Sequence, residues 1–232
     1  MDNRKISICI PTYNRYQMTI ESFAQVLDDN RVSDIVILDD LSTDGSYEQL
    51  LNHCSYKVRV YQNDRNYDCY RNKQRVVSLA KNEWVIVLDS DNIITPEYLN
   101  AIYTISEWNP IVVYQPSFAK PHFDFRKFAG NYYGDFDVRE NLHDGAFTTA
   151  LNAMNFFINR DTYLRAFNPD IDPVTSDSIY MAYRLLEQGN SYYFVPGLEY
   201  EHRIHPGSHY QNNVNRTPHN FHQSILEKLA AL

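Results

Sequence analysis

The chain has 232 residues, enough for one sizeable hydrophobic core, and its 21 Lys and Arg against 29 Asp and Glu give a formal net charge of −8. This acidic balance argues against nucleic acid as a partner, which would demand clustered Lys and Arg. No apolar run approaches the ~20 residues of a membrane-spanning helix, and Met-Asp-Asn-Arg-Lys at the start lacks the apolar centre of a signal peptide. Because Cys9, Cys54 and Cys69 match no metal or disulfide spacing, we expect a cytoplasmic protein.

Apolar strands alternate with helical patterns through the first half of the chain, which is typical of βαβ units and a mostly parallel sheet. The predicted strands cover residues 6–10, 35–38, 58–61 and 84–88, and Pro11 is expected to end the first. The predicted helices cover residues 18–27, 47–51 and 70–80. A further helix is predicted to start at Thr95-Pro96-Glu97, because Thr can cap a helix and Pro suits its first position.

The alternation weakens after Pro110. Strands are predicted at 111–114, 155–158 and 192–195, a helix at 175–187 ended by Gly189, and a closing helix over 219–232. Residues 117–144 are rich in aromatic side chains and show little periodicity. Loops of this length are usually functional or mobile, so we expect this stretch to contribute to a binding site.

Two carboxylates follow the fourth predicted strand, in the segment Asp89-Ser90-Asp91. Binding sites in parallel α/β sheets lie where such strands end, and neighbouring carboxylates repel unless one is protonated or a cation neutralises them. Oxygen ligands with no cysteine nearby indicate Mg²⁺ or Mn²⁺, and Mg²⁺ typically combines one or two carboxylates with substrate phosphates. The segment therefore predicts a metal site for a phosphorylated small molecule; the alternative is a polar turn after a strand.

Three motifs, in this order, resemble those of family 2 glycosyltransferases of the GT-A fold. They are Ile8-Cys9-Ile10-Pro11-Thr12-Tyr13-Asn14-Arg15, Val36-Ile37-Leu38-Asp39-Asp40-Leu41-Ser42-Thr43-Asp44-Gly45 and Leu88-Asp89-Ser90-Asp91, the last similar to the family's DXD element. Asn66, Arg71 and Asn72 match the segment that precedes that element, although Asp68 stands where Gly is frequent. The resemblance covers about residues 5–210, and the ordered set is far more specific than a lone D-x-D.

The resemblance implies a Rossmann-like α/β fold of the GT-A type, with a mostly parallel central sheet flanked by helices and a small antiparallel C-terminal part. We expect a single domain over residues 1–210 and a C-terminal tail and helix over 211–232. Within the domain, a donor half is expected at about 1–115 and an acceptor and catalytic half at about 116–210.

The resemblance also implies a nucleotide-sugar donor site. Pro11 and Tyr13 would lie at the base, Asp40 would accept a hydrogen bond from a uracil or ribose, and Arg71 would face the base or diphosphate. As alternatives, Asp39 and Asp40 form only an Asx turn, and Arg71 is a solvated helix arginine. The full predicted donor set is Pro11, Thr12, Tyr13, Arg15, Asp40, Asn66, Arg71, Asp89, Ser90, Arg203 and Ser208.

The same resemblance implies the metal ligands. Asp91 is the expected direct ligand, while Asp89 would reach the ribose or a metal-bound water. The segment from Glu201 to Ser208 is similar to a late element of the family, which favours His205 over His202 as a further ligand and places Arg203 or Ser208 at the diphosphate. The predicted set for Mn²⁺ or Mg²⁺ is Asp91, Asp89 and His205.

Asp177 opens an apolar helix and resembles the acid that supplies the family's catalytic base. The alternative is an acid that only favours the helix dipole, a contribution of roughly 0.3–1 kcal/mol. Ser176 stands where a second acid is usual, and the spacing to Arg184 is one residue longer than expected. Asp170 and Asp172 are nearby substitutes for the base.

The implied function is metal-dependent, inverting transfer of a sugar from a nucleotide-diphosphate sugar, with UDP favoured, to an acceptor hydroxyl in cell-surface polysaccharide or glycoconjugate synthesis. The acceptor is expected to be a glycan or a lipid-linked glycan, which would bring the protein to the inner membrane face as a peripheral protein. Its contacts are expected within residues 118–147, where Tyr132, Tyr133 and His143 are unranked candidates.

Two alternative functions stay open. A sugar-phosphate nucleotidyltransferase normally has a Gly-rich opening loop with a basic signature, which residues 10–15 lack. A catalytically degenerate nucleotide-sugar-binding module would be favoured if Asp177 proved remote from the metal.

Overall fold

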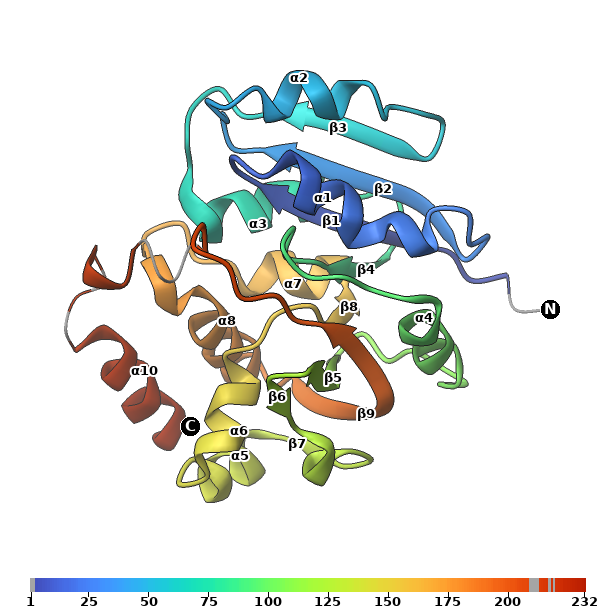
Figure 1. The fold of residues 1–232 in the computed structure, drawn as a ribbon. Helices are drawn as coiled ribbons and strands as arrows, with labels where there is room; N and C mark the ends of the chain where they lie inside the picture. The colour runs from blue at the N-terminus through green and yellow to red at the C-terminus, as the bar shows by residue number, and fades with distance from the viewer. Residues whose placement is uncertain (1–2, 209–212, 217, 219) are drawn as a thin grey trace.

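The computed structural model describes residues 3–208, 213–216, 218 and 220–232. Within them the centre of the fold is a nine-stranded sheet with the order β3-β2-β1-β4-β8-β5-β9-β7, and β6 pairs with β5 beside this path. Figure 1 shows the sheet from β3 at the top to β7 at the bottom, with helices packed around it. No helix of this part of the chain is long and apolar enough to cross a membrane.

The first half forms a parallel sheet, in which β1 pairs with β2 and β4, and β2 pairs with β3. Its strands are β1 (Ile6–Thr12), β2 (Val32–Asp39), β3 (Val58–Gln62) and β4 (Trp84–Val87). Its helices are α1 (Tyr16–Phe23) with the 3₁₀ turn η1 (Ala24–Val26), α2 (Ser46–Leu51), α3 (Asp68–Ser78) and α4 (Pro96–Tyr103). The apolar runs of β1 and β4 are completely buried, as expected of strands covered on both faces.

The second half adds antiparallel pairing, because β8 runs against both β4 and β5, β6 against β5 and β7 against β9, whereas β5 and β9 are parallel. Its strands are β5 (Val112–Lys120), β6 (Phe123–Asp124), β7 (Tyr132–Tyr133), β8 (Phe157–Asn159) and β9 (Ser191–Glu201). Its helices are α5 (Asp135–Asn141), α6 (Gly145–Leu151), α7 (Arg160–Ala166), α8 (Asp177–Glu187) and α10 (Phe221–Ala230). Single 3₁₀ turns are η2 (Arg126–Phe128), η3 (Val174–Ser176) and η4 (Val214–Arg216).

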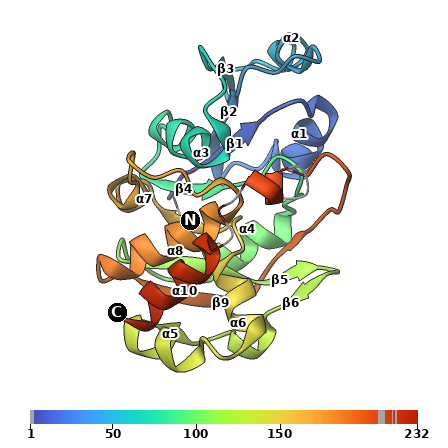
Figure 2. The same cartoon turned by 90° about the vertical axis from the view of Figure 1, so that its left-hand side faces the viewer.

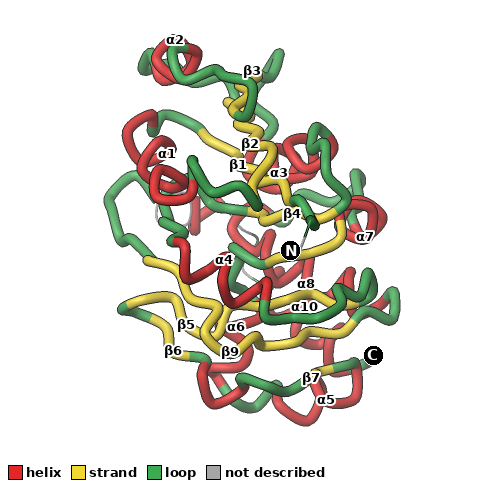
Figure 3. Tube along the Cα trace, turned by 90° about the vertical axis from the view of Figure 1, so that its right-hand side faces the viewer, coloured by secondary structure: helices red, strands yellow, loops and turns green. Residues whose placement is uncertain are grey.

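Helices cover both faces of the parallel half. Figure 2 shows α1 and α2 on one side of the sheet and α3 and α7 on the other, and Figure 3 gives the same arrangement from the opposite side. Helix α3 packs against α7, α7 against α8, and α8 against α10. The predicted α/β class, a mostly parallel sheet with an antiparallel C-terminal part, is therefore confirmed.

Several predicted boundaries are wrong in informative ways. Pro11 does not end β1: it pairs with Leu38, and the strand continues to Thr12, whose carbonyl accepts a hydrogen bond from the Asp40 amide at 2.8 Å. Thr95 is the N-cap of α4 but makes no capping hydrogen bond with its side chain. The predicted closing helix begins at Phe221 in the structure, and His219 lies outside the described residues.

The stretch 117–144 is not a loop, since it holds the end of β5 together with β6, η2, β7 and α5. These elements are two to nine residues long, too short for a periodic pattern. Helices α6 and α7, of seven residues each, are likewise too short to be predicted from periodicity. Strand β9 runs six residues beyond its predicted end at 195, to Glu201, which forms a bridge with Ile93. This extension brings the segment 202–208 to the end of β4.

Candidate functional site

A cavity of about 970 Å³ lies where β1, β2 and β4 end, as expected for an α/β sheet. Its walls also include the cavity-facing side of α3, the start of α8, and the segment that follows β9. The volume is at the upper end of the ~300–1,000 Å³ typical of small-molecule sites, so it can hold an extended ligand.

The cavity gathers every predicted site residue except Arg71. Those that line it are Pro11, Thr12, Tyr13, Arg15, Asp40, Asn66, Asp89, Ser90, Asp91, Asp177, Arg203, His205 and Ser208. They come from positions spread over almost 200 residues, and the parallel strand ends bring them together. The predicted base and the predicted metal ligands thus share one cavity.

Arg71 lies on a different side of α3. Cys69, Asn72 and Lys73 line the cavity, whereas Arg71 donates to the Pro169 carbonyl at 3.2 Å and is 3.5 Å from Asp172. Helical geometry separates Arg71 from the cavity-lining face by about a third of a turn or more. This placement gives no support to the predicted contact with the base or diphosphate, which stays a prediction.

The candidate substitutes for the base and the candidate acceptor residues also lie elsewhere. Asp170 and Asp172 are not among the described residues that line the cavity, which favours Asp177. Tyr132 stacks on Tyr193 with ring centroids 4.4 Å apart, Tyr133 packs against the buried Phe147, and neither is among the described residues that line the cavity. His143 is likewise outside the lining; the 118–147 stretch contributes Phe123 and Phe125 instead.

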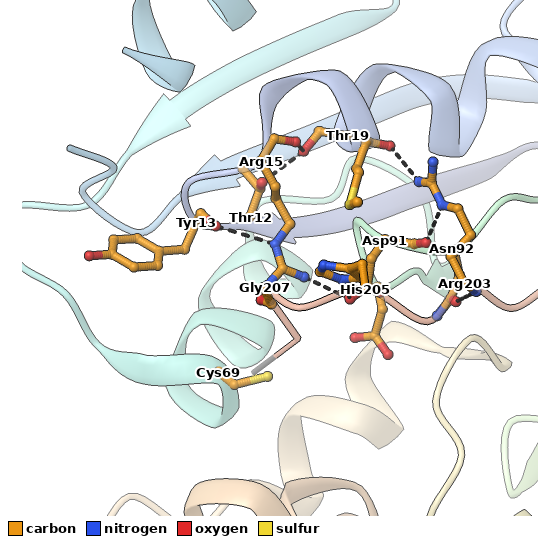
Figure 4. Close-up of polar contacts among 12 residues, drawn as sticks. Thr12, Tyr13, Arg15, Thr19, Cys69, Asp91, Asn92, Arg203, His205 and Gly207 are labelled. Carbon is orange, nitrogen blue, oxygen red and sulfur yellow. Dashed lines mark hydrogen bonds and ion pairs between the residues drawn. The ribbon is translucent and has the colours of Figure 1, made fainter. Parts of the chain in front are cut away.

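Asp91 is the centre of a cluster of basic groups (Figure 4). Its Oδ2 accepts a hydrogen bond from Arg15 Nη1 at 2.8 Å and lies 3.0 Å from His205 Nε2. The second guanidinium nitrogen of Arg15 donates to the Gly207 carbonyl at 2.9 Å, so Arg15 also ties the segment after β9 to this carboxylate. Burial opposes ionisation of Asp91, but His205 and Arg15 outweigh it and lower the pKa of this carboxyl.

Arg203 contacts the backbone next to this cluster. Its guanidinium donates to the Asp91 and Met18 carbonyls and pairs with Glu21, and its backbone amide donates to Asn92 Oδ1 at 3.3 Å. A guanidinium with three protein partners is already largely satisfied. The geometry therefore favours a structural role for Arg203, and of the two predicted diphosphate contacts it favours Ser208.

Lys73 joins the other carboxylates of the cavity. Its Nζ lies 2.8 Å from Asp177 Oδ2 and 3.0 Å from Asp89 Oδ1, and its side chain is only 4% exposed. Burial works against the charge of Lys73, yet the two carboxylates raise the pKa of this ammonium well above its usual range. Burial likewise raises the pKa of Asp89; Lys73 opposes this shift, and Asp91 adds to it.

The sequence interpretation did not identify Lys73. The only available signal was its position directly after Arg71-Asn72, four residues from Cys69 on the same helical face. A lysine in a polar helix usually lies in solvent, so its burial between two carboxylates is visible only in three dimensions.

Asp39 and Asp40 organise the loops at the end of β2. Asp39 accepts hydrogen bonds from the amide and hydroxyl of Ser42, three residues on, so Asp39 alone holds this turn and Asp40 has other partners. Asp40 accepts from Asn63 Nδ2 at 2.7 Å and from the Tyr67 amide at 2.9 Å. Burial raises the pKa of Asp40 to about 6, against the effect of these hydrogen bonds.

The departure at position 68 has a clear structural counterpart. Asp68 has φ 61°, in the left-handed region that favours Gly. Asp is among the residues that tolerate this region best, and its carboxylate pairs with Arg216 at 2.9 Å. Asp68 thus adopts the backbone conformation that Gly favours, with some local strain.

The possible metal ligands around Asp91 suit a divalent cation. Adjacent ligands of an ion with bonds of ~2.1 Å lie roughly 3 Å apart, which matches the 3.0 Å between Asp91 Oδ2 and His205 Nε2. Among the described residues there is no group of three or more His, Cys, Asp or Glu that could hold a metal. The protein would therefore supply two ligands here, and ligand oxygens or water would supply the rest.

Comparison with solved structures identifies the fold. The mannosyltransferase PcManGT from Pyrobaculum calidifontis, in complex with GDP-Man and Mn²⁺, matches with a TM-score of 0.65 and 14% identity over 99% of this chain and 70% of that chain. S. aureus TarS residues 1–349 in complex with UDP matches with a TM-score of 0.68 and 16% identity over 98% and 64%. The fold is that of the GT-A glycosyltransferases.

The sequence comparisons then give the family. The sequence model of Glycosyl transferase family 2 matches residues 7–165, more than half of the chain, so the chain belongs to this family. WcaA of Escherichia coli K12, provisionally named a colanic acid biosynthesis glycosyl transferase, is 32% identical over 104 residues, 43% of this chain and 37% of WcaA. Streptococcus pneumoniae GlyG is 28% identical over 101 residues, 42% of this chain and 34% of GlyG. The matches therefore span less than two-fifths of these curated relatives.

Proposed function

We propose that the protein transfers a sugar from a nucleotide-diphosphate sugar to an acceptor hydroxyl, with Asp177 as the base. The observation that carries this proposal is the placement of the Asp91–His205 pair and Asp177 in one cavity, with Lys73 between Asp177 and Asp89. The family membership supports the reaction class.

In this reaction the acceptor oxygen forms a bond to the anomeric carbon of the donor sugar. The bond from that carbon to the β-phosphate oxygen breaks, and its electron pair leaves with the nucleoside diphosphate. Asp177 takes the proton of the acceptor hydroxyl, which keeps the oxygen nucleophilic as it attacks. Direct attack on the face opposite the leaving diphosphate inverts the configuration of the sugar.

Asp91 and His205 are the residues that would hold a divalent metal. When bound, the metal would offset the negative charge that develops on the departing diphosphate. An imidazole nitrogen is a softer ligand than oxygen and favours Mn²⁺ over Mg²⁺, and PcManGT holds Mn²⁺ together with GDP-Man. Asp89 is a weaker candidate ligand than Asp91, because Lys73 already pairs with it.

We favour a uridine nucleotide as the donor. Asp40, Asn66 and Tyr13 line the same cavity, and a carboxylate suits the N–H edge of uracil. Related structures were solved with UDP in one case and GDP-Man in another, so the fold accepts both nucleotides. We infer from the names of relatives such as WcaA that the acceptor belongs to a surface polysaccharide or glycoconjugate, and a lipid-linked acceptor would place the reaction at the membrane.

Isotope transfer from a panel of UDP- and GDP-sugars, with Mn²⁺ and a mixed glycan acceptor pool, tests the proposal. We expect labelled product from one donor class and loss of that product with EDTA. If donors bind but only slow donor hydrolysis occurs, the nucleotide-sugar-binding module replaces this proposal. Release of pyrophosphate from a nucleoside triphosphate would instead support a nucleotidyltransferase.

A further inference from the structure

We propose that Lys73 is a positioning residue that holds Asp177 at a fixed place relative to Asp89, and so couples the acceptor side of the cavity to the donor side. This inference rests on the proposed function, since it takes Asp177 as the base and Asp89 as a donor-side residue. Lys73 acts through the two carboxylates and is assigned no bond to the reacting atoms.

The geometry singles out Lys73 because it connects elements that come from different parts of the chain. Asp89 follows β4, whereas Asp177 is the first residue of α8, and the Lys73 ammonium lies within 3.0 Å of an oxygen of each. Cys69, one turn earlier on α3, adds a weak contact from Sγ to Asp177 Oδ2 at 3.5 Å. Helix α3 therefore presents two groups to the same oxygen of Asp177.

The free-energy cost of burying the Lys73 ammonium also favours a role beyond stability. Removing an ammonium from water costs several kcal/mol, and apolar residues of similar volume often replace buried ion pairs with no loss of stability. A buried lysine between two carboxylates of one cavity is therefore poorly explained by folding alone. What the ion pairs supply is orientation, because a charge-assisted hydrogen bond fixes where the carboxylate points.

Orientation matters because the base must reach one particular hydroxyl. A displacement of ~1 Å in an active site can cost on the order of 100-fold in rate. Without Lys73, Asp177 would keep its place at the start of α8 but lose the contact that sets its carboxylate relative to the donor. Donor binding would then survive while the transfer step slows.

The test compares Lys73→Met, Lys73→Arg and the control Lys57→Met, which alters another buried lysine that lies outside the cavity lining and donates to the Leu27 and Asp29 carbonyls. We expect Lys73→Met to keep donor affinity within about threefold by calorimetry and to lower kcat for transfer by on the order of 100-fold. Lys73→Arg, which keeps the charge, should retain more of the kcat than Lys73→Met. Lys57→Met should leave both quantities unchanged. A wild-type kcat in Lys73→Met, or loss of donor binding that accounts for the whole effect, would overturn the proposal.

A double-mutant cycle with Asp177→Asn separates positioning from a general loss of structure. If Lys73 acts through Asp177, its replacement should cause little further loss of kcat in the Asp177→Asn background. Independent, multiplying losses would overturn the proposal. If Lys73→Met does not fold, Lys73→Gln, which removes the charge but keeps a polar head group, serves in the same cycle. Absence of transfer by the wild type would overturn the proposed function itself, a result distinct from these.

Discussion

Arg15 donates a hydrogen bond to Asp91 at 2.8 Å, so the carboxylate expected to bind a metal is already paired with a cation from the chain itself. Lys73 has the same relation to Asp89. The two neighbouring acids, which need a cation to offset their repulsion, are therefore each paired with a basic side chain in this structure. A metal at Asp91 must compete with Arg15 for Oδ2.

This competition predicts that Arg15→Met raises the affinity for Mn²⁺ in the absence of donor. Hydrogen bonds to charged groups contribute roughly 1.5–3 kcal/mol, and ~1.4 kcal/mol corresponds to a tenfold change in affinity, so we expect a gain of about tenfold. Calorimetric titration with Mn²⁺ alone measures it. Arg216→Met is the matched control, since Arg216 lines the same cavity but pairs with Asp68. Weaker Mn²⁺ binding in Arg15→Met would show that Arg15 supports the site instead of competing for it.

The second prediction concerns the two histidines of the late motif. His205→Ala should weaken Mn²⁺-dependent donor binding by at least ~10-fold, because it removes one of two protein ligands, and Asp91→Asn should abolish it. His202→Ala is the control, because a ring nitrogen of His202 contacts one of His122 at 2.9 Å, whereas His205 is the histidine that contacts Asp91 Oδ2. Equal effects of the two histidine variants in calorimetry would remove His205 from the proposed metal site.

Asp177→Asn separates binding from chemistry. The Asn amide keeps the shape of the Asp side chain but cannot take the proton of the acceptor hydroxyl. We therefore expect donor affinity within about threefold of wild type and a kcat lower by ~10²–10⁴-fold. Single-turnover transfer with labelled donor is the measurement. Turnover near the wild-type value would move the base to another residue.

The raised pKa of Asp40 predicts a specific dependence of folding stability on pH. Its pKa is about 6 in the folded protein, above the ~3.9 of an unfolded Asp, so the folded state binds more protons between these values. Stability from this group is fully present below the unfolded pKa and is lost as pH rises through about 6, by roughly 3 kcal/mol in total. Urea unfolding of wild type and Asp40→Asn between about pH 4 and 7 should show the two free energies diverge by that amount. Parallel curves would mean that Asp40 ionises normally in the folded state.

The sequence determined the parallel half of the fold, because its strands are continuous apolar runs that local pattern reveals. It also determined which residues follow β1, β2 and β4, and these line the cavity since parallel strands end at one edge of the sheet. Elements of the second half, such as β6 and α6, were missed. These elements are too short to show a periodic pattern, and contacts with residues distant in the sequence stabilise them.

Which side chains pair with one another depends on how the elements pack in three dimensions. Arg71 and Lys73 are two residues apart on one helix, yet one pairs with Asp172 near the surface and the other lies buried between Asp89 and Asp177. A sequence gives the charges but not the distances between them, and electrostatic energy depends on both distance and burial. The sequence therefore identifies the acidic residues of the site. The basic residues that neutralise them are identified only in the folded structure, where the strand ends lie together.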